Sequence, residues 1–303
     1  MATANQAPIR AATPADLTLL VLLAAVWGSA FMAIKIAVPE TGPVWLVALR
    51  ASIGFLALLP WALYRGWVWP ADAREWGMVV ALALFNVLIP FFLISWAQQS
   101  LHSSTTALLM GSGPLIALLL AHATSHDDKM NLLKLVAVVL GFSGVATVLG
   151  VAAFSGLSGK LLPQAAALLA SASYVFSGTL VRRIASIPPV RLSTLVLGTA
   201  ASLFVPIALL TSGPLPELSQ KGWTAIVYLG LFPTGLAYIL RYQLVRAIGL
   251  SVFAHVGNMI PLFGVLFGVA LLGEPLTATL AIAAALIFSG LAAARLGSRA
   301  KAS

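Results

Sequence analysis

The sequence has no cysteine and little charge, and these two absences exclude several classes of protein. Without cysteine, the 303 residues form no disulfide bond, thiolate metal site or cysteine nucleophile. Charged residues make up 8% of the chain and hydrophobic residues 60%, whereas about a quarter of the residues in a soluble domain are charged. A chain of this composition cannot solvate its own surface. The sequence therefore predicts an integral membrane protein.

Acidic residues are scarce as well, and none of the eight falls in the middle of an apolar run. Proton- and sodium-driven carriers usually bury a carboxylate within the membrane. Coupling would have to use His255 or backbone carbonyls instead, so facilitated diffusion or exchange is the expected mode of transport. The sequence also lacks paired catalytic carboxylates, an HExxH motif and a Walker loop. We therefore expect no enzyme, no metal and no cofactor.

Ten apolar runs are each long enough to cross a bilayer, which takes about 20 residues in a helix. They cover approximately residues 17–37, 43–63, 76–97, 103–122, 132–152, 161–181, 190–211, 223–243, 250–272 and 277–294. The connections are short and carry glycine, proline and charge, so no soluble domain fits between them. The expected fold class is an all-α integral membrane protein with ten transmembrane helices.

Positive charges are distributed unequally between the two sides that these runs define. If the N-terminus is cytoplasmic, 13 of the 17 Lys and Arg residues lie inside. Lys35, Lys160 and Lys221 lie outside, and Arg50 lies within a run. Because positive residues concentrate on the cytoplasmic side, we expect both termini to be cytoplasmic. The net charge of +9 is then a topology signal, and we expect no nucleic-acid partner.

The two halves of the chain match each other at a constant offset of 147 residues. PLIALLL at 114–120 corresponds to PLFGVLF at 261–267, and Asp127 corresponds to Glu274. Each match is weak alone, but the shared offset indicates an internal duplication.

We divide the chain accordingly into a first five-helix repeat, residues 1–153, and a second, residues 154–303. Because five is an odd number, the two copies must insert with opposite orientation. Inverted repeats are typical of secondary transporters, whose substrate sites lie near the midplane where the repeats meet.

The run at 103–122 has the sequence GSGP at its centre, residues 111–114. Proline removes the hydrogen bond to the carbonyl four residues earlier, which predicts free carbonyls at Met110 and, through Pro261, at Gly257. At membrane depth, such groups are tolerated only where protein or a wet cavity covers them. Breaks at equivalent positions of both halves favour a binding cavity, although glycine and proline also permit close packing and a kink.

Three segments carry a resemblance to a known family: WGSAF at 27–31, Arg50 early in the second run, and the segment 238–276, which ends in GEPL. With these segments the chain resembles the EamA-type drug/metabolite transporters, most closely the YddG-type aromatic amino-acid exporters. The resemblance implies a basket of helices one to four and six to nine around a central cavity, with helices five and ten peripheral. The first repeat departs from it with HDDK at 126–129, where the second has GEP at 273–275.

Aromatic residues in the middle of runs are candidates for the cavity wall. Trp27 lies away from the interfacial belts, and its indole N–H needs a partner when buried. Its counterpart at the 147-residue offset is Tyr174. Two such rings offer a surface to an apolar or aromatic solute, or bind an ammonium through a cation–π contact. Packing alone explains both rings equally well.

Ionisable groups at membrane depth are expensive and therefore informative. Arg50 offers a bidentate site to a substrate carboxylate, or else it snorkels or binds free carbonyls. His255 is a candidate gate, proton carrier or packing residue. Lys35 and Arg241 lie close enough to the interfaces to snorkel, which is the interpretation we favour for both.

Polar residues and residues of the helix breaks complete the predicted cavity. Serine hydroxyls in membrane helices serve helix packing as well as solute binding, so they discriminate little. The predicted cavity residues are Trp27, Arg50, Asn86, Met110, Ser112, Pro114, Ser173, Tyr174, Ser177, Tyr238, His255, Asn258 and Pro261.

The predicted function is secondary transport of small metabolites across the bacterial inner membrane by alternating access. Export or facilitated diffusion of amino acids with aromatic or apolar side chains is favoured by the resemblance together with Arg50, Trp27 and Tyr174. The expected partners are a small-molecule solute and the lipid bilayer, and a monomer is expected. A multidrug or other metabolite carrier of the same superfamily, or a solute pore, stays open as an alternative.

The topology prediction is testable with reporters. Tags fused to either terminus should report the cytoplasm, and a reporter inserted near Lys160 should report the opposite side, because an odd number of helices precedes that loop. Accessibility to a membrane-impermeant label measures both. A cytoplasmic signal from the loop near Lys160 would remove the inverted repeat.

Overall fold

The computed structural model describes residues 10–67, 69–124, 131–150, 160–181, 184, 187–248, 253 and 255–299. Within these ranges every regular element is a helix, and eight helices are long and apolar enough to cross a membrane. A further apolar helix, Val256–Leu272, is shorter. The all-helical membrane fold expected from the sequence is confirmed at this level.

The helical elements follow one another along the chain, and two of them, η1 and η2, are π-helices. In order they are α1 (Pro14–Tyr64), α2 (Ala73–Leu82), η1 (Ala83–Leu88), α3 (Ile89–Ser100), α4 (Ser103–Met110), α5 (Gly113–Thr124), α6 (Leu132–Leu149), α8 (Leu161–Val181), α9 (Pro189–Ser212), α10 (Gln220–Leu229), η2 (Gly230–Leu236), α11 (Ala237–Ile248), α13 (His255–Leu272) and α14 (Ala278–Arg299).

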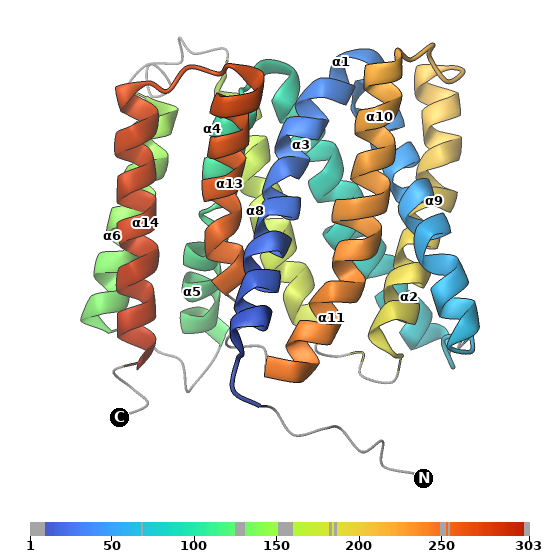
Figure 1. The fold of residues 1–303 in the computed structure, drawn as a ribbon, viewed down its shortest axis with the longest axis horizontal. Helices are drawn as coiled ribbons and strands as arrows, with labels where there is room; N and C mark the ends of the chain where they lie inside the picture. Colours follow the sequence, from blue (N-terminus) through green and yellow to red (C-terminus); the bar gives the residue numbers. More distant parts are fainter. Residues whose placement is uncertain are drawn as a thin grey trace.

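α1 contains the first two apolar runs, 17–37 and 43–63. Its backbone breaks at Gly42, which has φ 65° and ψ 169°, a conformation that glycine adopts without the steric cost of a Cβ atom. At this break the chain turns over at the top of the bundle, as Figure 1 shows. The two segments of α1 therefore correspond to two successive predicted spans. A capping box of Thr13 and Asp16 stabilises its start.

The two π-helices occupy equivalent places in the two halves of the chain. η1 separates α2 from α3 and η2 separates α10 from α11, and their first residues, Ala83 and Gly230, are related by the same 147-residue offset as the sequence matches. π-helical turns disturb the regular hydrogen-bond ladder and recur at functional sites. This pair is a structural feature of the repeat that the sequence matches did not reveal.

The helices form one bundle with α6 and α14 packed against each other at its edge (Figure 1). α1 lies against α9, α10 and α13, and α3 lies against α8, so the two halves of the chain interleave. Apolar side chains such as Ile34, Leu46 and Ile226 fill the contact between α1 and α10, and Leu115 and Ile287 fill that between α5, α6 and α14. The edge position of α6 and α14 agrees with the expected peripheral fifth and tenth helices.

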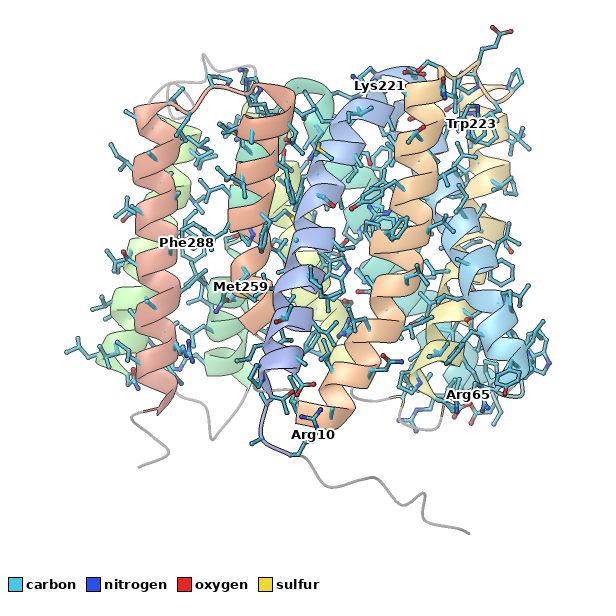
Figure 2. All side chains as sticks on the ribbon, in the orientation of Figure 1. Arg10, Arg65, Lys221, Trp223, Met259 and Phe288 are labelled. Atoms are coloured by element: carbon cyan, nitrogen blue, oxygen red, sulfur yellow. The ribbon has the colours of Figure 1, made fainter. Side chains whose placement is uncertain are left out.

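Charged residues mark the two ends of the bundle. The start of α1 and the end of α14 lie at the same end (Figure 1). Arg10 and Arg65 also lie there, whereas Lys221 and Trp223 lie at the opposite end, as Figure 2 shows. This distribution follows the charge asymmetry expected from the sequence.

Glu274 joins the two halves at the end of the bundle away from the termini. It is 7% exposed, and its carboxylate accepts hydrogen bonds from the backbone N–H groups of Ser103, at 2.6 Å, and Ser104, at 2.8 Å. These are the first residues of α4, whose N-cap, His102, makes no capping bond with its side chain. A carboxylate at a helix N-terminus satisfies free N–H groups and complements the helix dipole. Its predicted counterpart, Asp127, lies outside the described residues.

Replacing Glu274 by alanine should lower the free energy of unfolding by about 1–2 kcal/mol, the usual cost of losing an N-cap. Burial alone would raise the pKa of Glu274, but the hydrogen bonds from Ser104 and Ser103 outweigh it and the pKa is lowered from 4.5. The stabilisation is therefore complete above pH 4.5 and is lost as the pH falls through the lowered pKa.

Thermal unfolding in detergent across this pH range measures the effect. Glu217, which is exposed, provides a control when it is replaced by alanine. An unfolding midpoint equal for both variants at neutral pH would contradict the capping role.

Candidate functional site

A cavity of about 360 Å³ lies between helices of both halves. α1, η1, α3, α4 and α5 of the first half and α8, η2, α11 and α13 of the second half contribute to its wall. Its volume is in the range of small-molecule sites. The predicted residues that line it are Trp27, Arg50, Asn86, Met110, Pro114, Tyr174, Tyr238 and Pro261.

The GSGP stretch interrupts its helix, as the sequence predicts. α4 ends at Met110 and α5 begins three residues later, with Gly111 and Ser112 in a turn between them. The carbonyl of Met110, which Pro114 leaves without its helical donor, accepts a hydrogen bond from the Ser171 hydroxyl at 3.1 Å. A side chain of the second half therefore covers the carbonyl that the first half leaves free.

Pro261 packs directly onto this break. A Cβ atom placed on Gly111 would lie 2.8 Å from Cγ of Pro261, so the proline ring occupies the space that a side chain would need. The second break is weaker than predicted, because α13 continues through Pro261. Glycine and serine beside Pro114 further weaken its helix, whereas Pro261 follows Met259 and Ile260. Residues 249–252 and 254, at the start of the predicted run, lie outside the described residues.

Trp27 receives its hydrogen-bond partner from the other half of the chain. Its indole Nε1 donates to the carbonyl of Pro233, in η2, at 3.0 Å. Its ring meets Phe253 edge-on with the centroids 6.2 Å apart. The sequence predicted that the indole N–H of Trp27 needs a partner, and Pro233 supplies it. Trp27 and Tyr174 both line the cavity.

Arg50 places a positive charge at the cavity wall. Its side chain is 6% exposed, its Nε donates to the Thr234 hydroxyl at 2.7 Å, and its Cζ lies 3.7 Å from the centroid of the Phe91 ring. Among the residues that the structure describes, no carboxylate lies within ion-pair distance of Arg50. The guanidinium is thus held by a hydroxyl and a ring face, with no opposite charge.

A smaller cavity of about 190 Å³ adjoins the first. Asn86, Tyr174, Tyr238 and Arg241 line both cavities. Asn86 Nδ2 donates to the Tyr238 hydroxyl at 3.3 Å, and Asn86 Oδ1 accepts from the Ser177 hydroxyl at 3.0 Å. These bonds join η1, α8 and α11 at the boundary between the two spaces.

Comparison with known proteins gives the same fold and identifies the family. The model of the EamA-like transporter family matches residues 16–150 and again residues 161–296. The chain belongs to the EamA-like transporter family. It is 23% identical over 270 residues to the uncharacterized transporter YoaV of Bacillus subtilis, covering 88% of this chain and 91% of that protein.

Other relatives and a solved structure agree. The uncharacterized inner membrane transporter YedA of Escherichia coli K12 is 25% identical over 257 residues, covering 83% of this chain and 81% of that protein. A crystal structure shares the fold with a TM-score of 0.66 at 22% identity, covering 93% of this chain and 98% of the other. This EamA-like protein is therefore a membrane transporter.

Three predicted serines do not line the central cavity of this EamA-like transporter. Ser112 is fully buried and its hydroxyl bonds back to the Leu109 carbonyl at 2.7 Å. Ser173 donates to the Phe85 carbonyl in η1 at 2.7 Å, and Ser177 lines the smaller cavity. The hydroxyls of these three residues bind backbone and amide groups, and their role in substrate binding stays a prediction.

Asn258, also predicted to line the central cavity, does not line it. It lies on a face of α13 that lines a groove beside α14, away from the cavity, while its neighbour Gly257 lines the cavity with Pro261. Residues four apart share a helix face, whereas adjacent residues point about 100° apart. The His255 side chain lies outside the described residues, so its predicted role stays a prediction.

The structure gives two further cations contacts that the sequence did not predict. Arg241, expected to snorkel, lines both cavities; its spacing of three residues from Tyr238 on α11 was the available signal, because such residues share a face. Lys35, also expected to snorkel, donates to the carbonyls of Gln98 and Leu101, both at 2.7 Å. It thereby neutralises the free carbonyl end of α3.

The packing of Pro261 on Gly111 predicts an effect of volume at this position. Gly111→Val should lower the free energy of unfolding by about 1–3 kcal/mol, as overpacking does in a tight interior, because the rigid proline ring cannot move aside. Gly77→Val on α2 is the control, since no atom lies within 4 Å of a Cβ placed there. Thermal unfolding in detergent compares the two, and equal midpoints would show that Pro261 yields to the added side chain.

Proposed function

We propose that this EamA-like protein carries small solutes with a carboxylate and an apolar or aromatic side chain, in the first place amino acids, across the bacterial inner membrane. In this proposal ten helices cross the membrane as two inverted five-helix repeats, with both termini cytoplasmic. Transport follows alternating access around the central cavity, without a coupling ion. The observation that carries the proposal is the buried Arg50 without a carboxylate partner.

The energetic argument starts from the cost of a buried charge. An ion taken out of water stays costly unless an opposite charge and hydrogen bonds compensate it. Thr234 and Phe91 compensate Arg50 in part, and only its Nε has a hydrogen-bond partner among the described residues. A substrate carboxylate would supply the missing charge in a bidentate contact.

The apolar part of the solute would lie against aromatic rings. Trp27, Phe31, Phe91 and Tyr174 line the same cavity as Arg50. Aromatic contact adds about 0.5–1.5 kcal/mol beyond simple burial, which favours aromatic side chains over aliphatic ones of similar size. This arrangement supports the choice of aromatic and apolar amino acids.

Fewer contacts support a site for the ammonium group of an amino acid than support the carboxylate site at Arg50. The Met110 carbonyl already accepts from Ser171, although a carbonyl oxygen has two lone pairs. Asn258, expected to help, lies outside the cavity. Arg241 adds a second cation to the wall, and the residues lining the cavity include no Asp or Glu. These observations favour simple organic monocarboxylates as the second candidate class of solute.

The two-chamber arrangement supports the gating part of the proposal. The smaller cavity extends along α8 and α9 beyond the hydrogen bond from Asn86 to Tyr238, on the side where the proposed topology places the cytoplasm. Opening of this polar contact would join the two spaces. The π-helices that carry or adjoin these residues already depart from the regular helical ladder.

A matched trio of solutes tests the proposal: L-phenylalanine, 3-phenylpropionate and phenethylamine share a ring and differ in charge. In liposomes, labelled L-phenylalanine should show counterflow. If the protein also carries monocarboxylates, labelled 3-phenylpropionate should show it too. Arg50→Gln should weaken transport of both carboxylates about tenfold to a hundredfold, the loss of hydrogen bonds to a charged group. Phenethylamine has no carboxylate, so any counterflow that it shows should be the same in the wild type and in Arg50→Gln.

Thr234→Val is the matched control, because it removes a partner of Arg50 and keeps the charge. Equal loss of amino acid and amine in Arg50→Gln would make Arg50 a structural residue. Flux without counterflow would indicate a pore.

A further inference from the structure

A groove of about 660 Å³ runs along the outside of the bundle between α13 and α14. These helices are consecutive in the chain, but α13 packs mainly on α1 and α4, and α14 packs mainly on α6. Met259 of α13 and Phe288 of α14 line the groove from its two sides (Figure 2). The groove opens toward the surroundings of the bundle and shares no lining residue with the central cavity.

Two polar side chains in this groove lack partners in the described part of the chain. Asn258 makes no hydrogen bond there, and Arg295 makes no ion pair. An amide that faces hydrocarbon is costly unless something donates to it or accepts from it. A ligand that seats in the groove could bind both groups.

The order of side chains along the groove matches the order of groups in a phospholipid. Arg295 lies one helical turn from the end of α14, Asn258 lies near the described start of α13, and Phe288 lies seven residues before Arg295, a rise of about 10 Å. Charged groups belong at the headgroup, amides at the level of the ester carbonyls and apolar rings at the acyl chain.

We propose that this groove binds an anionic phospholipid of the leaflet on the side of the two termini. The phosphate lies against Arg295, an ester carbonyl accepts from the Asn258 amide, and an acyl chain lies over Leu262, Phe288 and Leu291. Basic groups near the membrane surface favour anionic lipids.

A lipid fits this space better than a second copy of the chain. An α-helix with its side chains is about 10–12 Å across, whereas the groove is the space between two helices of one bundle. A flexible acyl chain fills such a space, and its ester group also brings the acceptor that Asn258 needs.

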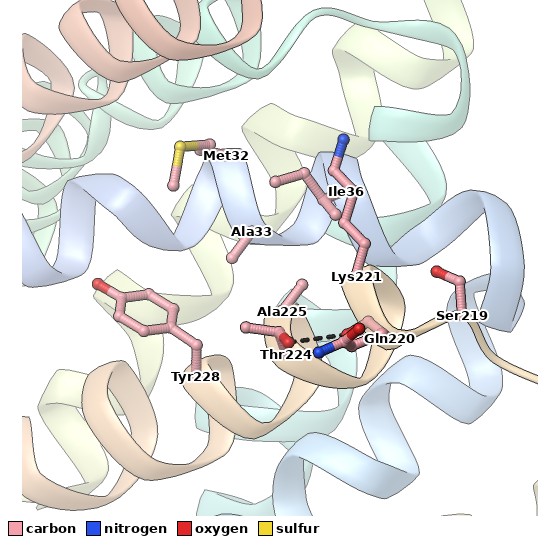
Figure 3. A pocket seen from close by; sticks show the side chains of 9 residues that line it. All are labelled: Met32, Ala33, Ile36, Ser219, Gln220, Lys221, Thr224, Ala225 and Tyr228. Carbon is pink, nitrogen blue, oxygen red and sulfur yellow. Dashed lines mark hydrogen bonds between the residues drawn. The ribbon is translucent and has the colours of Figure 1, made fainter.

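A second groove of similar size lies at the opposite end of the bundle, near Lys221. It lies between α1 and α10 with a volume of about 680 Å³, and Figure 3 shows the residues that line it. In it Thr224 donates to the Gln220 carbonyl at 2.7 Å, and Lys221 interacts electrostatically with Glu40. Lys221 therefore provides a matched control cation at the opposite end of the bundle.

Binding at the groove would reach the transport pathway through α13. This helix presents Gly257 and Pro261 to the central cavity and Asn258 and Met259 to the groove. A lipid seated behind α13 would restrain the helix whose other face forms the cavity wall.

Titration of the delipidated protein with phosphatidylglycerol, followed by native mass spectrometry, tests the site. Arg295→Gln should weaken binding roughly fivefold, the effect of one basic residue at an anionic surface. Asn258→Leu should weaken it by a similar factor, and Lys221→Gln should leave it unchanged. Soluble glycerol 3-phosphate should not compete, because the acyl chain supplies much of the contact. Thermal unfolding checks that each variant is folded.

Equal affinity for phosphatidylglycerol in the wild type, Arg295→Gln and Asn258→Leu would overturn the proposal. So would a wild-type dimer that Asn258→Leu dissociates, since the groove would then be an interface between copies. Competition by glycerol 3-phosphate would indicate a site for a free phosphate compound.

Discussion

Backbone groups inside a bilayer have no water to bind, and this constraint accounts for the most specific contacts in the structure. At three interruptions, the α4–α5 break and the two π-helices, a side chain from the opposite half of the chain donates a hydrogen bond to a backbone carbonyl. Ser171 donates to Met110, Ser173 donates to Phe85, and the Trp27 indole donates to a carbonyl in η2. These bonds join the halves at the depth where the helices are least regular.

The same constraint locates the cavity. Breaks in the helical ladder are tolerated only beside protein or a polar space, so the interruptions in α4–α5, η1 and η2 gather around one volume. Irregular turns also bend more readily than continuous helix, because fewer ladder bonds must change. A carrier that alternates between two open states needs such points near its binding site, and the proposed transport cycle uses them.

The wall of the central cavity is positively charged. The cavity wall holds Arg50 and Arg241, and its lining residues include no carboxylate, and the proposed function rests on the attraction of these cations for an anionic group. Arg50 is held in place by Thr234 and Phe91 rather than by an ion pair. A cation fixed in this way costs little rearrangement when an anionic group arrives, because its position exists before binding.

Much of the architecture could be predicted from the sequence, because it depends on properties that act along one chain segment. Low charge and long apolar runs indicate the membrane fold, the broken helix at Pro114 follows from proline chemistry, and the shared offset predicts the repeat. Only the tertiary structure decided which way each residue faces. Gly257 and Arg241 line the central cavity, whereas the adjacent Asn258 faces away from it. Glu274 binds the start of α4. In water, a polar stripe shows the outer face of a helix. In a bilayer both the protein interior and the surrounding lipid are apolar. The inward and outward faces of a membrane helix therefore have similar residue compositions, and only the packing of the helices shows which face is which.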